Sequence, residues 1–170
     1  AGIYVKLNRS DRAEALYSWA ADKFERNPKT DILQLSTLYS DMASFFRERG
    51  YPGDYEKAKI YYQKTEQGMK QIYGDKPHPE MAAFYDEYAL LYDNMGKYSE
   101  ALSLLQKALE IKQKTLKKEH PDIVQSYGSI GLIYYELTEY DKALDYLNEA
   151  LEIADKIWSG PFSFKSDIYN

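Results

Sequence analysis

Residues 100–114 read EALSLLQKALEIKQK, and residues 142–156, which begin 42 residues later, read KALDYLNEALEIADK. The two stretches share most of their apolar positions, including the segment ALEI at 108–111 and at 150–153. The same period continues upstream, where Tyr85 aligns with Tyr127, Leu90 with Leu132, Tyr92 with Tyr134 and Tyr98 with Tyr140. A repeat of this length predicts a stacked array in which each unit buries the apolar face of its neighbour.

Each unit contains two amphipathic helices. In the first helix, apolar residues recur at i, i+3, i+4 and i+7, at Tyr85, Tyr88, Ala89 and Tyr92. The second helix follows the same spacing, at Ala101, Leu105, Ala108 and Leu109. Gly96 lies between the helices, where a left-handed residue commonly ends a helix. We therefore expect an all-α chain built from helical hairpins.

Tyrosine is unusually frequent, with 18 Tyr beside 6 Phe and 2 Trp. A buried aromatic ring removes about 150–250 Å² from water, which is reason enough for a ring at a repeated core position. We assign to the core Tyr39, Tyr85, Tyr88, Tyr92, Tyr98, Tyr127, Tyr134 and Tyr140, together with Ile130.

The pattern Y..YA..Y followed by A...L..A resembles the tetratricopeptide repeat (TPR). The 42-residue period and the connectors HPE and HPD resemble the longer variant found in kinesin light chains. An earlier unit also fits, with Tyr39, Met42, Ala43 and Phe46 followed by Ala58, Tyr62 and Thr65. The resemblance implies a right-handed superhelical solenoid of antiparallel helix hairpins.

The same register places unit boundaries along the whole chain. It predicts a single array over 1–170, with a partial repeat at 1–30, repeats at about 31–78, 79–120 and 121–160, and the start of a further repeat at 161–170. Asn8 aligns with Gly96 and is expected to close a first helix with a left-handed cap. We expect the chain to be a fragment of a longer array. The outer face of 140–158 is then covered by the residues that follow it or by another copy.

Composition excludes several classes of protein. The formal net charge is −5 and the pI is near 5.2, which argues against a nucleic-acid-binding face. No apolar run approaches the ~18 residues of a membrane span, and the start of the chain does not resemble a signal peptide. The absence of Cys favours a reducing compartment, so a cytoplasmic location is expected.

The two histidines, His78 and His120, could in principle form a metal site or an acid/base pair. Each precedes a Pro and an acid in a connector between units. Pro at the first helical position and an acid in the first turn are typical of a helix start, which makes each His a helix cap. No further ligand is spaced to complete a metal site. We therefore expect no metal, no cofactor and no catalytic residue.

The resemblance also implies that the first helices of the units line a concave groove. We assign to this face Thr37, Ser40, Ser44, Arg47, Ala83, Asp86, Glu87, Leu90, Asp93, Asn94, Gln125, Gly128, Ser129, Leu132, Tyr135 and Glu136. Leu90, Leu132 and Tyr135 are the expected apolar anchors, while the acids select a partner protein or peptide that carries basic residues. The lysines near 112–118 are expected on a solvated face.

Other residues narrow the function that the resemblance implies. The Lys/Asn/Arg clamp of chaperone-binding members is absent, and Asp86–Glu87 and Gly128–Ser129 stand where kinesin light chains carry paired Asn. No phosphate loop, GxSxG or HExxH motif is present. The leading hypothesis is a protein- or peptide-binding scaffold. A sensor of signalling peptides and an architectural array that associates with itself remain alternatives.

Overall fold

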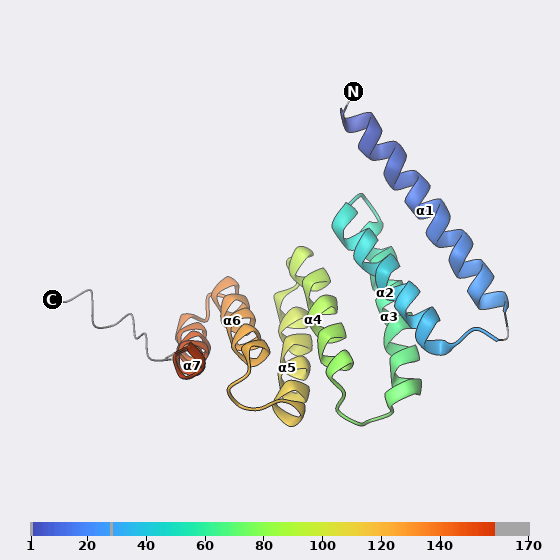
Figure 1. Ribbon diagram of the computed structural model, residues 1–170. Helices are drawn as coiled ribbons and strands as arrows, with labels where there is room; N and C mark the ends of the chain where they lie inside the picture. The colour runs from blue at the N-terminus through green and yellow to red at the C-terminus, as the bar shows by residue number, and fades with distance from the viewer. Residues whose placement is uncertain (1, 28, 159–170) are drawn as a thin grey trace. The chain divides into compact units, whose positions relative to one another are not determined.

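The computed structural model describes residues 2–27 and 29–158. Within these ranges every regular element is a helix, which confirms the expected all-α class (Figure 1). The elements are α1 (Gly2–Arg26), α2 (Ile32–Arg49), α3 (Asp54–Tyr73), α4 (Pro79–Asn94), α5 (Tyr98–Thr115), α6 (Pro121–Glu136) and α7 (Tyr140–Trp158). They form two compact units, residues 1–76 with α1–α3 and residues 77–170 with α4–α7. The start of a further repeat, expected at 161–170, lies outside the described residues.

The first helix differs from the sequence-based expectation. Asn8 lies inside α1, which runs without a break from Gly2 to Arg26. The predicted left-handed cap at Asn8 is therefore wrong. The turn within the α4–α5 hairpin uses Gly96, with φ 66°, whereas no Gly or Pro interrupts residues 3–26. A single Asn costs a helix only a fraction of a kcal/mol, so nothing in this segment ends the helix.

The two histidines begin helices, as predicted. The His78 Nδ1 atom accepts a hydrogen bond from the Glu80 backbone N–H at 3.3 Å, and His120 Nδ1 accepts one from the Asp122 N–H at 3.1 Å. Each His is the N-cap of its helix and is followed by a Pro in the first turn. Each ring therefore satisfies one of the backbone donors that a helix start leaves unpaired.

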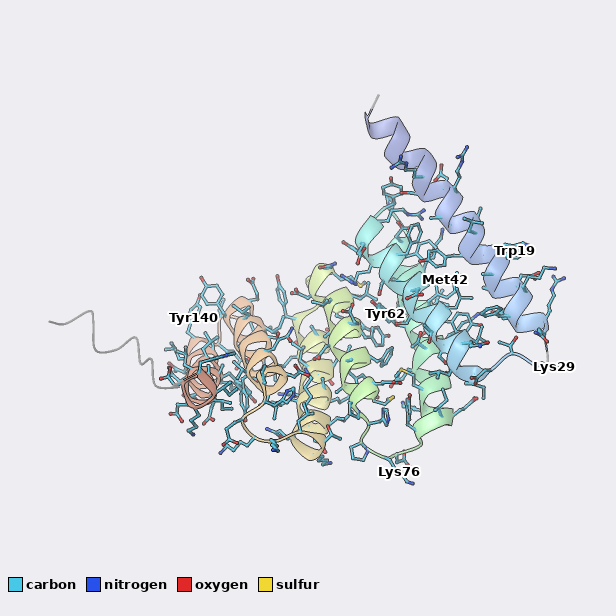
Figure 2. All side chains as sticks on the ribbon, in the orientation of Figure 1. Trp19, Lys29, Met42, Tyr62, Lys76 and Tyr140 are labelled. Atoms are coloured by element: carbon cyan, nitrogen blue, oxygen red, sulfur yellow. The ribbon has the colours of Figure 1, made fainter. Side chains whose placement is uncertain are left out.

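The cores of the hairpins pair large side chains with alanines. Met42 and Tyr62 are fully buried between α2 and α3, where Ala43 and Ala58 let the helices approach (Figure 2). In the second unit, Gly131 of α6 lies against α7. A Cβ atom there would come within 3.0 Å of the Leu147 side chain, so only glycine fits this approach without a shift.

The tyrosines of the repeat differ in burial. Tyr39, Tyr85, Tyr88 and Tyr134 are buried, and so is Ile130, as predicted. Tyr92, Tyr98 and Tyr127 are only partly buried. The core assignment of Tyr140 is wrong, because this residue is 54% exposed. Tyr140 is the first residue of α7, and its ring lies against Tyr135, with centroids 5.6 Å apart, instead of inside the hairpin.

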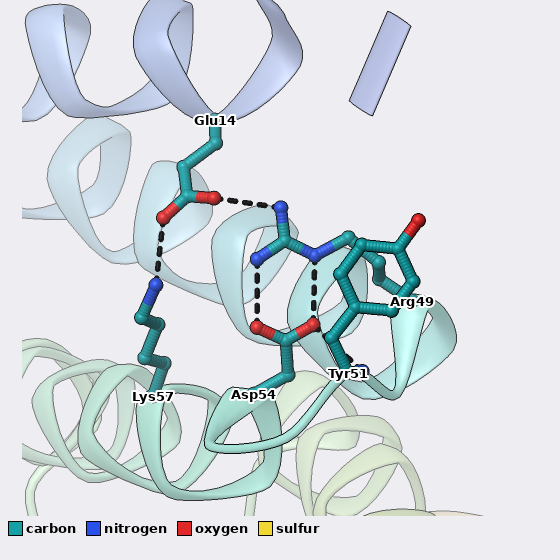
Figure 3. Close-up of polar contacts among 5 residues, drawn as sticks. All are labelled: Glu14, Arg49, Tyr51, Asp54 and Lys57. Carbon is teal, nitrogen blue, oxygen red and sulfur yellow. Dashed lines mark hydrogen bonds and ion pairs between the residues drawn. The ribbon is translucent and has the colours of Figure 1, made fainter. Parts of the chain in front are cut away.

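An ion cluster around buried Arg49 and Asp54 joins α1 to the start of α3 (Figure 3). The Arg49 guanidinium makes two parallel bonds of 2.7 Å to Asp54 and a third bond of 2.6 Å to Glu14 of α1. Lys57 binds the other Glu14 oxygen at 2.7 Å, and the Tyr51 backbone N–H donates to Asp54 at 2.9 Å. Asp54 is 2% exposed, so these contacts replace the water that its charge would otherwise require.

Candidate functional site

A groove of about 370 Å³ lies in the second unit and is lined by α4, α5 and α6. Its lining combines alanines and branched aliphatic side chains with acids, two serines, a lysine and a glutamine. The lining residues are Asp86, Glu87, Ala89, Leu90, Asp93, Ala101, Leu105, Lys112, Gln125, Ser126, Ser129, Leu132, Ile133 and Glu136. The structure thus brings together Asp86, Glu87, Leu90, Asp93, Gln125, Ser129, Leu132 and Glu136 from the face predicted by sequence.

Other predicted residues do not line this groove. In the second unit these are Ala83, Asn94, Gly128 and Tyr135. Tyr135 is 58% exposed and packs its ring against Tyr140, so it is not an anchor within the groove.

The remaining predicted residues, Thr37, Ser40, Ser44 and Arg47, belong to α2 in the first unit. Ser44 Oγ lies 3.2 Å from the Tyr62 hydroxyl, and Arg47 Nε donates to that hydroxyl at 3.3 Å. These two side chains therefore support the α2–α3 hairpin.

Lys112 is the principal correction to the sequence-based picture. It was expected on a solvated face, but its side chain is 7% exposed. The Lys112 Nζ atom donates to Asp86 Oδ2 at 2.6 Å and to Ser126 Oγ at 2.7 Å. The sequence contained a signal for this burial, since Lys112 continues the apolar stripe of α5 four residues beyond Ala108.

Asp86 is therefore committed to an internal partner. Burial raises the pKa of its carboxyl, and the hydrogen bond and positive charge of Lys112 act in the opposite direction. The pair joins α4 to α5, and Ser126 extends the connection to α6. Asp86 is thus held by an ion pair inside the fold, and its charge is balanced by Lys112.

Asp93 and Glu136 are two further acids of the groove, and the charge of Glu136 acts on Asp93. Burial raises the pKa of the Asp93 carboxyl, and the neighbouring negative charge of Glu136 raises it further. Glu136 also raises the pKa of Tyr98, through its charge and through a hydrogen bond from the Tyr98 hydroxyl. Within residues 9–27 and 29–158, no basic side chain pairs with either carboxylate. Two like charges held together in this way favour a cation between them.

Two leucines give the same groove exposed apolar surface. Leu90 of α4 is 42% exposed and Leu132 of α6 is 60% exposed, although both lie beside buried residues of their helices. They occupy equivalent places in successive repeats, 42 residues apart. The groove therefore offers two exposed apolar contacts beside a pair of carboxylates.

A second, more open groove of about 680 Å³ is lined mainly by α5 and α7, with Tyr127 of α6. Its lining includes Gln106, Gln113, Tyr146 and Glu149, none of which was predicted.

Among the described residues, no three His, Cys, Asp or Glu side chains are placed to hold a metal ion. The same part of the chain contains no helix long and apolar enough to cross a membrane.

Comparison with protein families matches the tetratricopeptide repeat over residues 34–114 and 79–156. No curated protein sequence matches the chain. Among solved structures, BtubC (BKLC) from P. vanneervenii is similar with a TM-score of 0.75 at 22% identity, covering 93% of this chain and 61% of BtubC. The chain thus spans less than two thirds of BtubC.

Two further structures share the fold. Repeats from Podosopora anserina described as kinesin light chain give a TM-score of 0.72 at 19% identity, covering 92% of this chain and 72% of theirs. The N-terminal domain of stress-induced protein-1 from C. elegans gives 0.56 at 18% identity, covering 74% and 94%. The chain belongs to the tetratricopeptide repeat family, and its fold is an all-helical repeat solenoid similar to the repeats of kinesin light chains.

Proposed function

We propose that the α4–α6 groove binds a peptide segment of a partner protein, with a Lys or Arg side chain of that segment between Asp93 and Glu136. The family makes the general role plain, because tetratricopeptide repeat solenoids are protein–protein interaction scaffolds. The observation that carries the specific proposal is the pair of acids without a cation beside the exposed Leu90 and Leu132.

The energetics of the groove favour a ligand that is both basic and apolar. Burial and the charge of Glu136 both raise the pKa of Asp93, and a cation placed between the two acids would offset both effects. Apolar side chains that cover Leu90 and Leu132 gain about 25 cal/mol for each Å² removed from water. Because the helices are packed before the ligand arrives, little ordering of the groove opposes binding.

The Lys112–Asp86 pair has a supporting role in this proposal. It fixes α4, α5 and α6 on three sides of the groove, so the spacing between Leu90 and Leu132 is set by the fold. Because of this pair, Asp86 is unsuitable for a charge-reversal test of binding. Substitution of Asp86 by Lys would bring two buried ammonium groups together and damage the fold, whereas Asp93 and Glu136 can be changed without breaking an internal ion pair.

The test uses a fluorescent peptide in which one Arg is flanked by Leu residues at helical spacing, and a matched peptide with Gln in place of Arg. Fluorescence anisotropy should show tighter binding of the Arg peptide to the unmodified chain. The double variant Asp93→Lys/Glu136→Lys should lose this preference while its circular dichroism spectrum stays helical.

Glu110→Lys is the matched control, since this exposed acid lines the second groove on α5 and α7. It reverses a charge of the same sign and should leave the affinity for the Arg peptide unchanged. Equal affinity of the unmodified chain for the Arg and Gln peptides would refute the proposed cation site. Loss of binding in Glu110→Lys alone would move the site to the second groove.

A further inference from the structure

We propose that the chain binds a second copy of itself head to tail, with α7 of one copy packed against α1 of the next. The first observation is an apolar stripe on α7. Tyr140, Leu144, Leu151 and Trp158 are 54%, 59%, 63% and 63% exposed. Their spacing of four, seven and seven residues places them along one side of the helix. Four large side chains in a row exceed the scattered apolar residues of an ordinary surface.

An acidic row borders this stripe. Asp141, Asp145 and Glu152 each follow one of the apolar residues in the sequence, and all three are exposed. Residues one position apart on a helix are about 100° apart around its axis, so the acids form a second row next to the first. A different side of α7 packs into the hairpin, through buried Ala143 and Ile153.

The complementary face lies on α1. Leu16 and Trp19 are 67% and 63% exposed, and Figure 2 shows Trp19 on the side of α1 turned away from α2. Arg12 precedes Leu16 by four residues, and Lys23 follows Trp19 by four, so both bases share the face of this apolar pair. The other side of α1 carries Glu14, which is held in the ion cluster with Arg49.

The opposite charges of the two faces favour contact between α7 and α1 over contact between two copies of the same face. When α7 meets α1, apolar side chains meet apolar side chains, and the acidic row of α7 meets Arg12 and Lys23. Two α7 faces would bring acidic rows together, and two α1 faces would bring bases together, which is unfavourable in both cases. A contact between different faces leaves one α1 and one α7 uncovered, so it can be repeated with further copies.

The experiment measures the mass of the full chain by sedimentation velocity across a range of concentrations at low salt. The average mass should rise with concentration, and high salt should reduce the rise because exposed ion pairs are screened. Trp19→Glu and Leu151→Lys should each remain monomeric when alone. A mixture of the two variants should give a 1:1 dimer that does not grow, because each variant keeps one intact face.

Leu132→Lys is the matched control, since Leu132 is 60% exposed but lies in the peptide groove. This variant should associate like the unmodified chain. Lys23→Glu should weaken association about tenfold, equivalent to about 1.4 kcal/mol, and mixing Lys23→Glu with Asp145→Lys should restore part of this loss. Helical circular dichroism spectra for all variants ensure that a change in mass reports a lost contact.

Three results would overturn the proposal. An unmodified chain that stays monomeric at every concentration would assign the α7 face to residues 159–170 or to a different protein. An average mass of Trp19→Glu alone that rises with concentration would show that α7 pairs with α7. A Leu132→Lys variant that fails to associate would place the contact in the peptide groove.

Discussion

Lys112 Nζ lies 2.6 Å from Asp86 Oδ2, and this ion pair joins α5 to α4 within one repeat. The ammonium group also donates to Ser126 in the next repeat, so one cation holds three helices around the groove. A buried Lys that ends an otherwise apolar stripe is stabilised only while its partners remain. The shape of the groove thus depends on an ion pair inside the fold.

Lys112→Ala should lower the free energy of unfolding by about 2–3 kcal/mol, because it leaves Asp86 partly buried without its cation. Urea unfolding followed by circular dichroism measures this change. Lys114→Ala is the control, since Lys114 is 57% exposed and pairs with Glu110 on the surface. It should change the free energy by less than about 1 kcal/mol. Equal effects of the two variants would contradict the structural role of Lys112.

Asp54→Asn should destabilise the first unit by about 2 kcal/mol at neutral pH, since Asn cannot carry the charge that Arg49 binds. The hydrogen bonds from Arg49 lower the pKa of Asp54 in the folded chain. This stabilisation is therefore complete above the ordinary Asp pKa of about 3.9 and is lost as the pH falls through the lowered folded value. Unfolding measured from neutral to acidic pH should show that the difference between Asp54→Asn and the unmodified chain shrinks on acidification.

Asp93→Asn should raise the free energy of unfolding at neutral pH, whereas Asp54→Asn should lower it. Burial and Glu136 raise the pKa of Asp93, so ionisation of this carboxyl opposes folding at neutral pH. The variant should be more stable than the unmodified chain at pH 7, by up to about 0.5 kcal/mol for a partly exposed position. The gain should disappear as the pH falls through the raised folded pKa towards the ordinary value, where Asp93 is protonated. A loss of stability at neutral pH would mean that an internal cation pairs with Asp93.

Gly68→Ala should destabilise α3 against α2. A Cβ atom at Gly68 would lie 2.0 Å from Ser36 Oγ, which at present donates to the Ile32 carbonyl at 2.8 Å. We expect a loss of about 1–2 kcal/mol in urea unfolding, because overpacking exceeds the helix-propensity gain of Ala. Ser36→Ala in the same chain removes the clashing oxygen and should recover most of the loss. If Ser36→Ala did not recover the stability, the contact between residues 68 and 36 would not be the cause of the loss in Gly68→Ala.

The sequence was sufficient to predict the helical hairpins, the histidine caps and most of the groove, because these follow from a period and from local spacing. Asp93, Leu132 and Glu136 lie where the repeat register placed them. The register failed at Asn8, since a cap needs a sequence that stops the helix and alignment alone does not supply one. It also failed at Tyr140, because a residue that opens a helix can turn its ring towards solvent.

The role of Lys112 could not be read from residue type. Lysine is almost always exposed, and its burial depends on Asp86 and Ser126, which arrive from two other helices. Such pairing is a property of the packed helices. The sequence placed the acids of the groove on one face, but only the packing shows that Asp86 is paired with Lys112 inside the fold.

The most direct test of the central claim is a titration of the isotope-labelled chain with the Arg peptide, followed by amide NMR shifts. We predict that the shifts concentrate at Leu90, Asp93, Leu132 and Glu136, and that they vanish in Asp93→Lys/Glu136→Lys. Shifts confined to the second groove, around Gln113, Tyr146 and Glu149, would contradict the assignment of the α4–α6 groove as the peptide-binding site.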